Sequence, residues 1–327
     1  MKQTLLCAGL IAIATPVLAE KAELTIYAPD YFTSEWGPGP KIEAAFEATC
    51  DCDIKYLPGD ILPRLLLEGE RTKADVVIGL NTDVTKKARE TGLFLPHGQD
   101  TSDLTLPIEW TDEVFLPFNW GHTAFIYNNE KMADAPTSFD AFLNSDDDVK
   151  VVVQDPRSSI SGLALMLWMK AVYGDNVEEA FAKLAPKVLT VTKGWSESYG
   201  MFTDGEADMV LSYTTSPAYH IIAEEDETKS AAIFDEGHYF MTELVGMVKT
   251  TEQPELAQQF MDFVLSETFQ EMIPTANWSF PAKLSEDKWP EGFKKLALPE
   301  KALFYTEDEA AALRDEVLDA WLAAFSQ

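Results

Sequence analysis

The chain alternates short apolar runs with longer segments in which apolar residues recur at helical spacing. A short apolar run predicts a buried β-strand, and the segments between the runs predict amphipathic helices. Strands that are apolar on both faces and alternate with helices are typical of a parallel sheet covered by helices. The predicted strands are residues 24–27, 53–57 and 75–80, and, where the pattern restarts, 150–154, 188–193 and 208–213. The pattern therefore indicates an α/β fold with two such units.

Two extended, aromatic-rich stretches, residues 115–128 and 237–249, flank the second unit. They predict two strands that cross between two lobes and serve as a hinge on which the lobes close. Lobe 1 is predicted to hold residues 20–118 and 248–327, and lobe 2 residues 122–238. In open α/β sheets a ligand lies beyond the carboxyl ends of the strands, so we expect a ligand in the interlobe cleft.

Residues 1–19 have the pattern of a secretory signal peptide. Lys2 supplies a positive charge, residues 5–17 are almost continuously apolar, and small residues stand at Val17 and Ala19 before the expected cleavage point. This apolar run is too short to span a membrane. We therefore expect a periplasmic protein whose mature chain starts near Glu20.

The formal net charge of −30 argues against nucleic acid and anionic lipid as partners. It suits a cationic ligand, or only a soluble surface. Cys50 and Cys52 remain after cleavage, and an oxidising compartment favours a disulfide between them, with two free thiols as the alternative. The histidines have no metal-ligand spacing, and dinucleotide, P-loop and nucleophile-elbow motifs are missing, so we expect no catalysis, cofactor or metal.

Aromatic residues stand where the fold places a ligand. Trp195 and Tyr213 lie at the ends of predicted strands, and Trp36 and Trp278 lie in loops. Such rings can hold a flat, cationic ligand by stacking and by cation–π contacts. Core packing is the alternative for each ring alone, and we assign Trp168, inside an apolar run, to the core.

Hydroxyl-bearing residues stand at two predicted helix starts. They are Ser159 at one start, and Thr214, Thr215 and Ser216 at the other. Backbone N–H groups and hydroxyls at a helix start can bind a phosphate or a carboxylate, and ordinary N-capping is the alternative. Asp30 and Asp60 lie in turns after strands and could face a ligand cation, although Asp60 could instead cap the next helix.

Short segments along the whole mature chain carry a family resemblance. They are EWGPGP (35–40), the CxC at 50–52, KADVVIGL (73–80), QDPRSS (154–159), VTKGWSESYG (191–200), LSYTTSPAYHI (211–221), EGHY (236–239) and IPTANW (273–278). In these segments and in their order, the chain resembles the periplasmic thiamine-binding proteins of bacterial thiamine ABC importers. The pair KGWSE and SYTTSPAYH is highly specific.

The resemblance implies a two-lobed, type II periplasmic-binding-protein fold. It also implies a monomer that binds thiamine, thiamine monophosphate and thiamine diphosphate and docks onto a membrane permease. The ligand-binding residues it implies are Gly59, Asp60, Ser159, Ile160, Trp195, Tyr213, Thr214, Thr215 and Ser216, with Trp278 stacking on the ligand. The chain departs from the family pattern at Ile160, where a second hydroxyl is expected, and at Pro29, where an aromatic residue is expected.

Two other functions suit the same fold. A thiamine-degrading transferase would need a cysteine nucleophile, for which Cys50 and Cys52 are the candidates in the mature chain. A ferric-ion binder would use phenolate ligands such as Tyr213 and Tyr219, and a polyamine binder would suit the acidic surface. Capture for import is the favoured interpretation.

Overall fold

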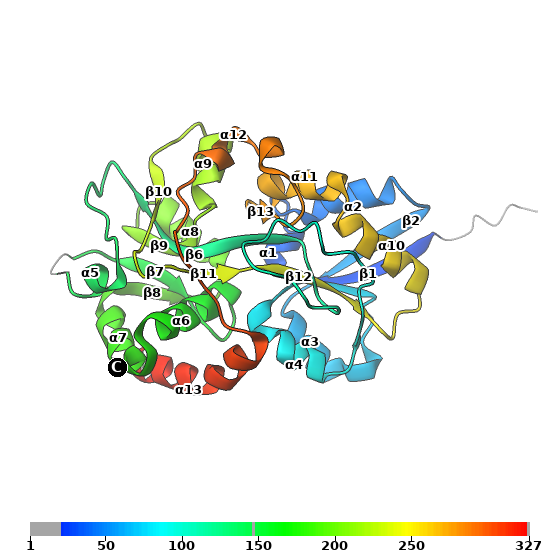
Figure 1. The fold of residues 1–327 in the computed structure, drawn as a ribbon, viewed down its shortest axis with the longest axis horizontal. Coiled ribbons are helices and arrows are strands. Elements are labelled where there is room, and N and C mark those ends of the chain that lie inside the picture. The colour runs from blue at the N-terminus through cyan, green and yellow to red at the C-terminus, as the bar shows by residue number, and fades with distance from the viewer. Residues whose placement is uncertain (1–20, 146–147, 326–327) are drawn as a thin grey trace, which may run out of the picture.

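In the computed structural model, which describes residues 21–145 and 148–325, the chain forms two α/β lobes side by side (Figure 1). The predicted signal peptide, residues 1–19, lies outside the described residues. Each lobe is built on one sheet with helices packed against it. Within the described ranges, no helix has both the length and the apolar character needed to cross a membrane.

The sheet of lobe 1 has the strand order β2-β1-β3-β12-β4, with β5 paired to β12. Its strands are β1 (Ala22–Ala28), β2 (Cys52–Pro58), β3 (Val76–Asn81), β4 (Phe94–Leu95), β5 (Leu116–Pro117) and β12 (Glu243–Val248). As predicted, β1 runs parallel to β2 and β3, whereas β12 returns antiparallel to β3. The helices of this lobe are α1 (Asp30–Thr33), α2 (Gly39–Glu47), α3 (Ile61–Glu68), α4 (Thr85–Glu90), α10 (Pro254–Val264) and α11 (Glu267–Ala276).

The sheet of lobe 2 has the strand order β14-β11-β6-β9-β7-β8, with β10 and β13 paired to β6. Its strands are β6 (Asn119–Asn128), β7 (Val151–Gln154), β8 (Val188–Thr192), β9 (Met209–Tyr213), β10 (Lys229–Ala232), β11 (His238–Met241), β13 (Phe280–Pro281) and β14 (Ala302–Leu303). Strand β7 is parallel to β8 and β9. The helices packed on this sheet are α5 (Phe139–Leu143), α6 (Ile160–Tyr173), α7 (Val177–Leu184), α8 (Trp195–Thr203), α9 (Ser216–Ala223), α12 (Glu291–Lys294) and α13 (Glu307–Phe325).

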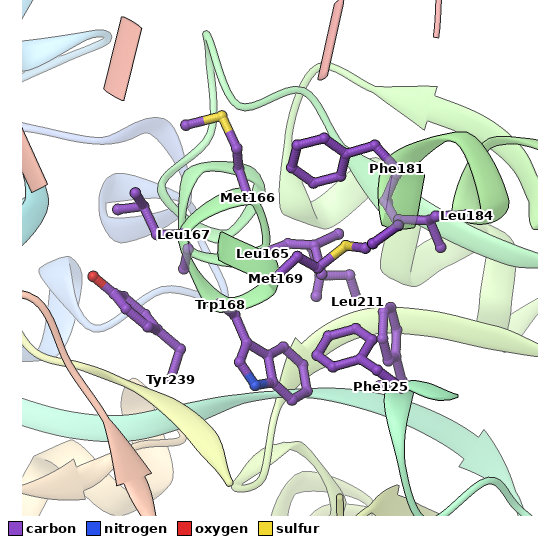
Figure 2. Close-up of a cluster of buried hydrophobic side chains, with 14 of the residues drawn as sticks. Phe125, Leu165, Met166, Leu167, Trp168, Met169, Phe181, Leu184, Leu211 and Tyr239 are labelled. Carbon is purple, nitrogen blue, oxygen red and sulfur yellow. The ribbon is translucent and has the colours of Figure 1, made fainter. Parts of the chain in front are cut away.

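The core of lobe 2 forms around α6, in which residues 161–170 are all buried. Trp168 is fully buried, its ring lies 4.4 Å from that of Phe139, and its Nε1 donates to the Gly237 carbonyl over 2.9 Å. Figure 2 shows Trp168 below α6, next to Phe125. The assignment of Trp168 to the core is confirmed.

Two strands cross between the lobes as predicted, and their crossing points lie side by side. The chain leaves lobe 1 between β5 and β6 and returns between β11 and β12. Phe118 N donates to the Glu243 carbonyl over 3.1 Å, and Thr242 Oγ1 donates to the Asn119 carbonyl over 2.5 Å. These bonds join the two crossings into one narrow connection.

The structure corrects the predicted extent of lobe 1, because its second part does not run from residue 248 to 327. Strands β13 and β14 pair with β6 and β11 of the lobe 2 sheet. Val317 and Trp321 of α13 belong to the lobe 2 core. The chain therefore crosses a third time after α11, in the orange segment of Figure 1. The apolar pattern predicts the last helix but not the lobe on which it packs.

Helix α13 contacts both lobes. Near its start, Glu307 Oε1 accepts from Nε of Arg89 on α4 over 3.1 Å. Near its end, the Trp321 ring packs against Phe181 of α7 with centroids 5.2 Å apart. The helix therefore spans the two lobes along one side of the molecule (Figure 1).

Candidate functional site

Three helices of lobe 2 start just beyond the carboxyl ends of neighbouring strands. Strand β7 leads to α6, β8 to α8 and β9 to α9, and β7 lies between the other two strands in the sheet. Because these strands are parallel, their carboxyl ends share one edge of the sheet and the three helix N-termini gather there. The predicted residues at these starts are Ser159 and Ile160 at α6, Trp195 at α8, and Tyr213, Thr214, Thr215 and Ser216 at α9.

The indole N–H of Trp195 is hydrogen-bonded to a pair of serine hydroxyl groups. Its Nε1 donates to Ser212 Oγ over 2.7 Å, and Ser212 Oγ lies 2.7 Å from Ser216 Oγ. The Tyr213 backbone N–H donates to Ser216 Oγ over 3.4 Å. The structure therefore brings Trp195, Tyr213 and Ser216 together, and it engages the Ser216 hydroxyl within the protein. Ser212 was not predicted, because a serine inside an apolar strand gives no signal of its own.

One face of the Trp195 ring is covered by Tyr199. The two rings stack with centroids 4.6 Å apart and an angle of 22° between their planes. Trp195 stays partly exposed, so part of its indole ring is open to a ligand. Tyr199 was also missed, although its spacing of one helical turn from Trp195 is a usable signal.

The start of α6 carries paired hydroxyl groups. Ser159 Oγ lies 3.0 Å from Ser161 Oγ, and Ser161 also hydrogen-bonds the Tyr213 side chain. Burial raises the pKa of Tyr213 to about 12, so its phenol stays protonated at neutral pH. Ile160 presents no hydroxyl, but the buried Ser161 places one directly beside it.

Ordinary N-capping does not use these hydroxyls. Ser159 is the N-cap residue of α6 and Thr215 that of α9, yet neither side chain accepts a capping hydrogen bond. Thr214 is fully buried, and its Oγ1 has no hydrogen-bond partner among the described residues. Such a hydroxyl at a helix start is a group that a ligand can satisfy. The N-capping interpretation of Ser159 and Thr215 is wrong.

More unpartnered polar atoms are buried near the crossing strands. Buried polar groups in proteins are nearly always hydrogen-bonded, so each exception calls for an explanation. The atoms that lack a partner within residues 21–145 and 148–325 include Asn81 Oδ1, Thr82 Oγ1, Trp120 Nε1, His122 Nδ1, Thr123 Oγ1, Gln154 Oε1 and Glu243 Oε1. They stand on β6, at the start of β12 and at the carboxyl ends of β3 and β7.

Glu243 ties all three crossing segments together. It starts β12 and is only 3% exposed. Its Oε2 accepts from Asn119 Nδ2 on the first crossing and, over 2.9 Å, from Asn277 Nδ2 at the third. Burial raises the pKa of Glu243 to about 8. A carboxyl group that titrates near neutral pH therefore lies at the junction of the lobes.

Trp278 approaches lobe 2 from the third crossing segment. Its ring meets Tyr219 of α9 edge-on, with centroids 5.1 Å apart and an angle of 83° between the planes. Trp278 has a φ of +53°, which is uncommon for a bulky residue. Backbone strain of this kind concentrates at functional sites, so it favours a role for Trp278 beyond packing.

Within the described residues, the predicted ligand residues of lobe 1 make no hydrogen bond to the predicted residues at the starts of α6, α8 and α9. Asp60 is the N-cap residue of α3, but its exposed side chain makes no capping bond, so the capping interpretation is wrong. Gly59 has a φ of +130°, a conformation that glycine adopts readily and other residues rarely do. Asp30 is exposed at the start of α1, and Trp36 is 85% exposed.

Two surface cavities lie away from these residues. One of about 310 Å³ lies between α7 and α13, and one of about 600 Å³ lies beside β1, β2 and α3. Neither is lined by a predicted ligand residue. The candidate site therefore rests on the side chains that meet at the strand ends, and the interlobe cleft stays a prediction.

The residues suggested for the alternative functions are poorly suited to them. Cys50 and Cys52 form a disulfide, and Cys52 is buried in the core of lobe 1. A bonded sulfur cannot supply the thiolate that a cysteine nucleophile needs. Burial also raises the pKa of Tyr219, so neither it nor Tyr213 is prepared to act as a phenolate ligand of ferric iron.

Comparison with known proteins places the chain in a family. The family model described as "Bacterial extracellular solute-binding protein" matches residues 29–271. This chain belongs to that family. The solute-binding protein is 43% identical to the thiamine-binding periplasmic protein of Escherichia coli over 325 residues, which cover 98% of this chain and 99% of the relative. The protein of the same name from Salmonella typhimurium is 44% identical over 97% of this chain and 98% of its own length. The resemblance predicted from the sequence is confirmed.

Solved structures agree with the fold. A periplasmic thiamin binding protein, 43% identical, matches the solute-binding protein with a TM-score of 0.91 and covers 98% of this chain and 100% of that one. Iron-bound HitA from Pseudomonas aeruginosa, 19% identical, matches with a TM-score of 0.73 over 93% of this chain and 99% of its own, and shows the fold alone. The predicted two-lobed periplasmic-binding-protein fold is confirmed.

Proposed function

We propose that this solute-binding protein captures thiamine in the periplasm and delivers it to the membrane permease of an ABC importer. The observation that carries the proposal is the meeting of Trp195, Tyr213 and the hydroxyl-bearing starts of α6 and α9 at one sheet edge. Relatives named thiamine-binding periplasmic proteins, at 43% and 44% identity over nearly the whole chain, support thiamine as the ligand.

The chemistry of thiamine suits these side chains. Thiamine joins a flat aminopyrimidine ring to a thiazolium ring that carries a permanent positive charge. The open part of the Trp195 ring can stack on either ring, and a cation–π contact is worth about 0.5–2 kcal/mol. The net charge of −30 makes the protein as a whole attract cations, which favours encounter with a cationic ligand.

We further propose that thiamine monophosphate and diphosphate place their phosphate groups at the starts of α6 and α9. Ser159 and Thr215 make no capping bond, and Thr214 Oγ1 is buried without a partner among the described residues. Helix N-termini attract anions, because their first backbone N–H groups are unpaired and the helix dipole is positive there. Ser161 would replace the hydroxyl that Ile160 lacks.

Lobe 1 would complete the site by closing on the ligand. Its proposed contacts are Asp30, Trp36, Gly59 and Asp60, which lie after β1 and β2 on or near the surface. Trp36, 85% exposed, would pack against the ligand and so lose contact with water. Each chain would hold a complete site, so we propose a monomer that only binds and releases its ligand.

Titration of the mature protein with thiamine tests the proposal. We expect a saturable change in tryptophan fluorescence and a matching heat in calorimetry, because the ligand would cover Trp195 and Trp36. Thiamine monophosphate and diphosphate should give the same type of response. Spermidine and ferric citrate serve as control ligands. A response to either of them, with none to thiamine, would assign the protein to a different solute.

Export is tested on the natural chain expressed with its own N-terminus. We expect the protein in the periplasmic fraction, with an intact mass that corresponds to a chain starting near Glu20. The same mass measurement under native conditions reports any co-purified thiamine and the oligomeric state. Cytoplasmic retention of a chain that still carries residues 1–19 would contradict the proposed location.

A further inference from the structure

The hydrogen-bonded network behind Trp195 continues into α9. Tyr199, which stacks on Trp195, has its hydroxyl 3.0 Å from His220 Nε2. His220 Nδ1 lies 2.6 Å from Glu224 Oε2. Tyr199 and His220 are 8% and 1% exposed, so water competes little for these bonds. An indole, a phenol, an imidazole and a carboxylate therefore follow one another from α8 across to α9.

His220 also lies behind the second tryptophan of the proposed site. The Tyr219 ring meets the His220 ring edge-on at 5.0 Å, and it meets the Trp278 ring edge-on at 5.1 Å. Trp195 belongs to α8, whereas Trp278 belongs to the third crossing segment. One buried imidazole therefore connects, through one tyrosine on each side, the two rings that we propose to face the ligand.

We infer that His220 is a positioning residue that orients Trp195 through Tyr199 and Trp278 through Tyr219. The bond from Trp195 Nε1 to Ser212 fixes one atom of the indole, and a single hydrogen bond does not by itself set the plane of the ring. The stack on Tyr199 sets the plane, and the bond to His220 in turn fixes Tyr199. A binding site depends on supporting residues of this kind to hold its contact groups in place. The inference rests on the proposed function, since it assigns a role in holding thiamine.

A metal site is the competing interpretation of the same residues. Ligand atoms of His220, Glu224 and Asp226 all lie within 4.8 Å of one another. However, Asp226 pairs with Lys229 Nζ at 2.8 Å, and that ammonium would repel a metal ion. Each of the three residues already has a protein partner, so positioning accounts for the contacts without an ion.

Two substitutions interrupt the network without touching the proposed ligand. Tyr199→Phe removes the hydroxyl that meets His220 and also hydrogen-bonds Ser216, and His220→Gln removes the imidazole while leaving the Tyr199 hydroxyl in place. We expect each variant to bind thiamine about 5- to 10-fold more weakly in calorimetry, as for partners within one network. His97→Gln is the matched control, because His97 is another buried histidine with two hydrogen bonds, located in lobe 1. It should leave the affinity unchanged.

A double-mutant cycle separates positioning from general loss of stability. If Tyr199 acts through the indole, Tyr199→Phe should change the affinity by less than about twofold once Trp195 is already alanine. A purely structural effect would instead persist in that background. The inference would be overturned if the wild type, Tyr199→Phe and His220→Gln bound thiamine with equal affinity. It would also be overturned if the effects of Tyr199→Phe and Trp195→Ala on the affinity were fully additive.

A measurement on the ligand-free protein tests the positioning role of His220 independently of the proposed thiamine binding. With 5-fluorotryptophan incorporated, we expect the ¹⁹F resonance of Trp195 to shift or broaden in both variants. The Trp278 resonance should change in His220→Gln but not in Tyr199→Phe, because Tyr219 contacts His220 directly. Unchanged resonances would overturn the inference whatever ligand the wild type binds. Failure of the wild type to bind thiamine would count against the proposed function alone.

Discussion

Replacing Trp195 with alanine is expected to weaken thiamine binding about 100-fold. The open part of the indole would supply both a stacking and a cation–π contact, together worth about 2–3 kcal/mol. The loss should fall mainly on the dissociation rate, because a missing contact seldom slows diffusional encounter. Calorimetry and stopped-flow fluorescence of the mature protein measure the two quantities.

Trp168→Ala is the matched control for this prediction. Trp168 is fully buried in the core of lobe 2, so its loss should reduce the free energy of unfolding by about 3–5 kcal/mol. The affinity of the molecules that remain folded should be nearly unchanged. If the two variants bound thiamine equally well, the assignment of Trp195 to the ligand would be wrong.

Changing Glu243 to glutamine is expected to remove a loss of stability that develops as the pH rises from 4.5 to about 8. Burial raises the pKa of Glu243 from 4.5 to about 8 in the folded protein. A raised pKa means that the folded chain holds this proton more tightly than the unfolded chain does. Its contribution to stability is therefore full below pH 4.5 and is lost as the pH rises through about 8. The loss is on the order of 3–5 kcal/mol.

Urea unfolding of both proteins from pH 4 to pH 9 tests this prediction. The variant should gain stability relative to the wild type as the pH rises. Below pH 6.5 the stability of both should fall with the pH, because burial lowers the pKa of His122 and His238 to about 4 and folding keeps these imidazoles neutral. Down to about pH 4.5 the wild type should lose less than the variant, because the contribution of protonated Glu243 grows as the pH falls. Parallel curves across the whole range would show that Glu243 does not titrate in this way.

Much of the fold could be predicted because its strands are short, apolar on both faces and separated by amphipathic helices. Residues 75–80 and 208–213, for example, correspond closely to β3 and β9. The place of the last helix could not be predicted. Its apolar face is compatible with either lobe, and the choice is fixed by the pairing of β13 with β6 and of β14 with β11. Contacts between distant segments of this kind leave no local signal in the sequence.

The residues of the candidate site that stand at the ends of strands could be predicted from the sequence. Trp195 and Tyr213 stand directly after or at the end of parallel strands, so the fold brings them together. Ser212, Tyr199 and His220 support the site from behind, and each has an ordinary core or surface pattern in the sequence. The N-capping interpretations failed because position alone does not show whether a hydroxyl or carboxylate makes the capping bond.

The third crossing has a practical consequence for following the molecule in solution. It carries the chain back to lobe 2, so α13 ends there, whereas β1, the first strand, belongs to lobe 1 (Figure 1). The two ends of the described chain therefore lie on opposite lobes. A donor fluorophore joined near Ala22 and an acceptor joined near Phe325 would report any rotation between the lobes as a change in energy transfer. The protein could thus serve as its own sensor of capture, with no label inside the site.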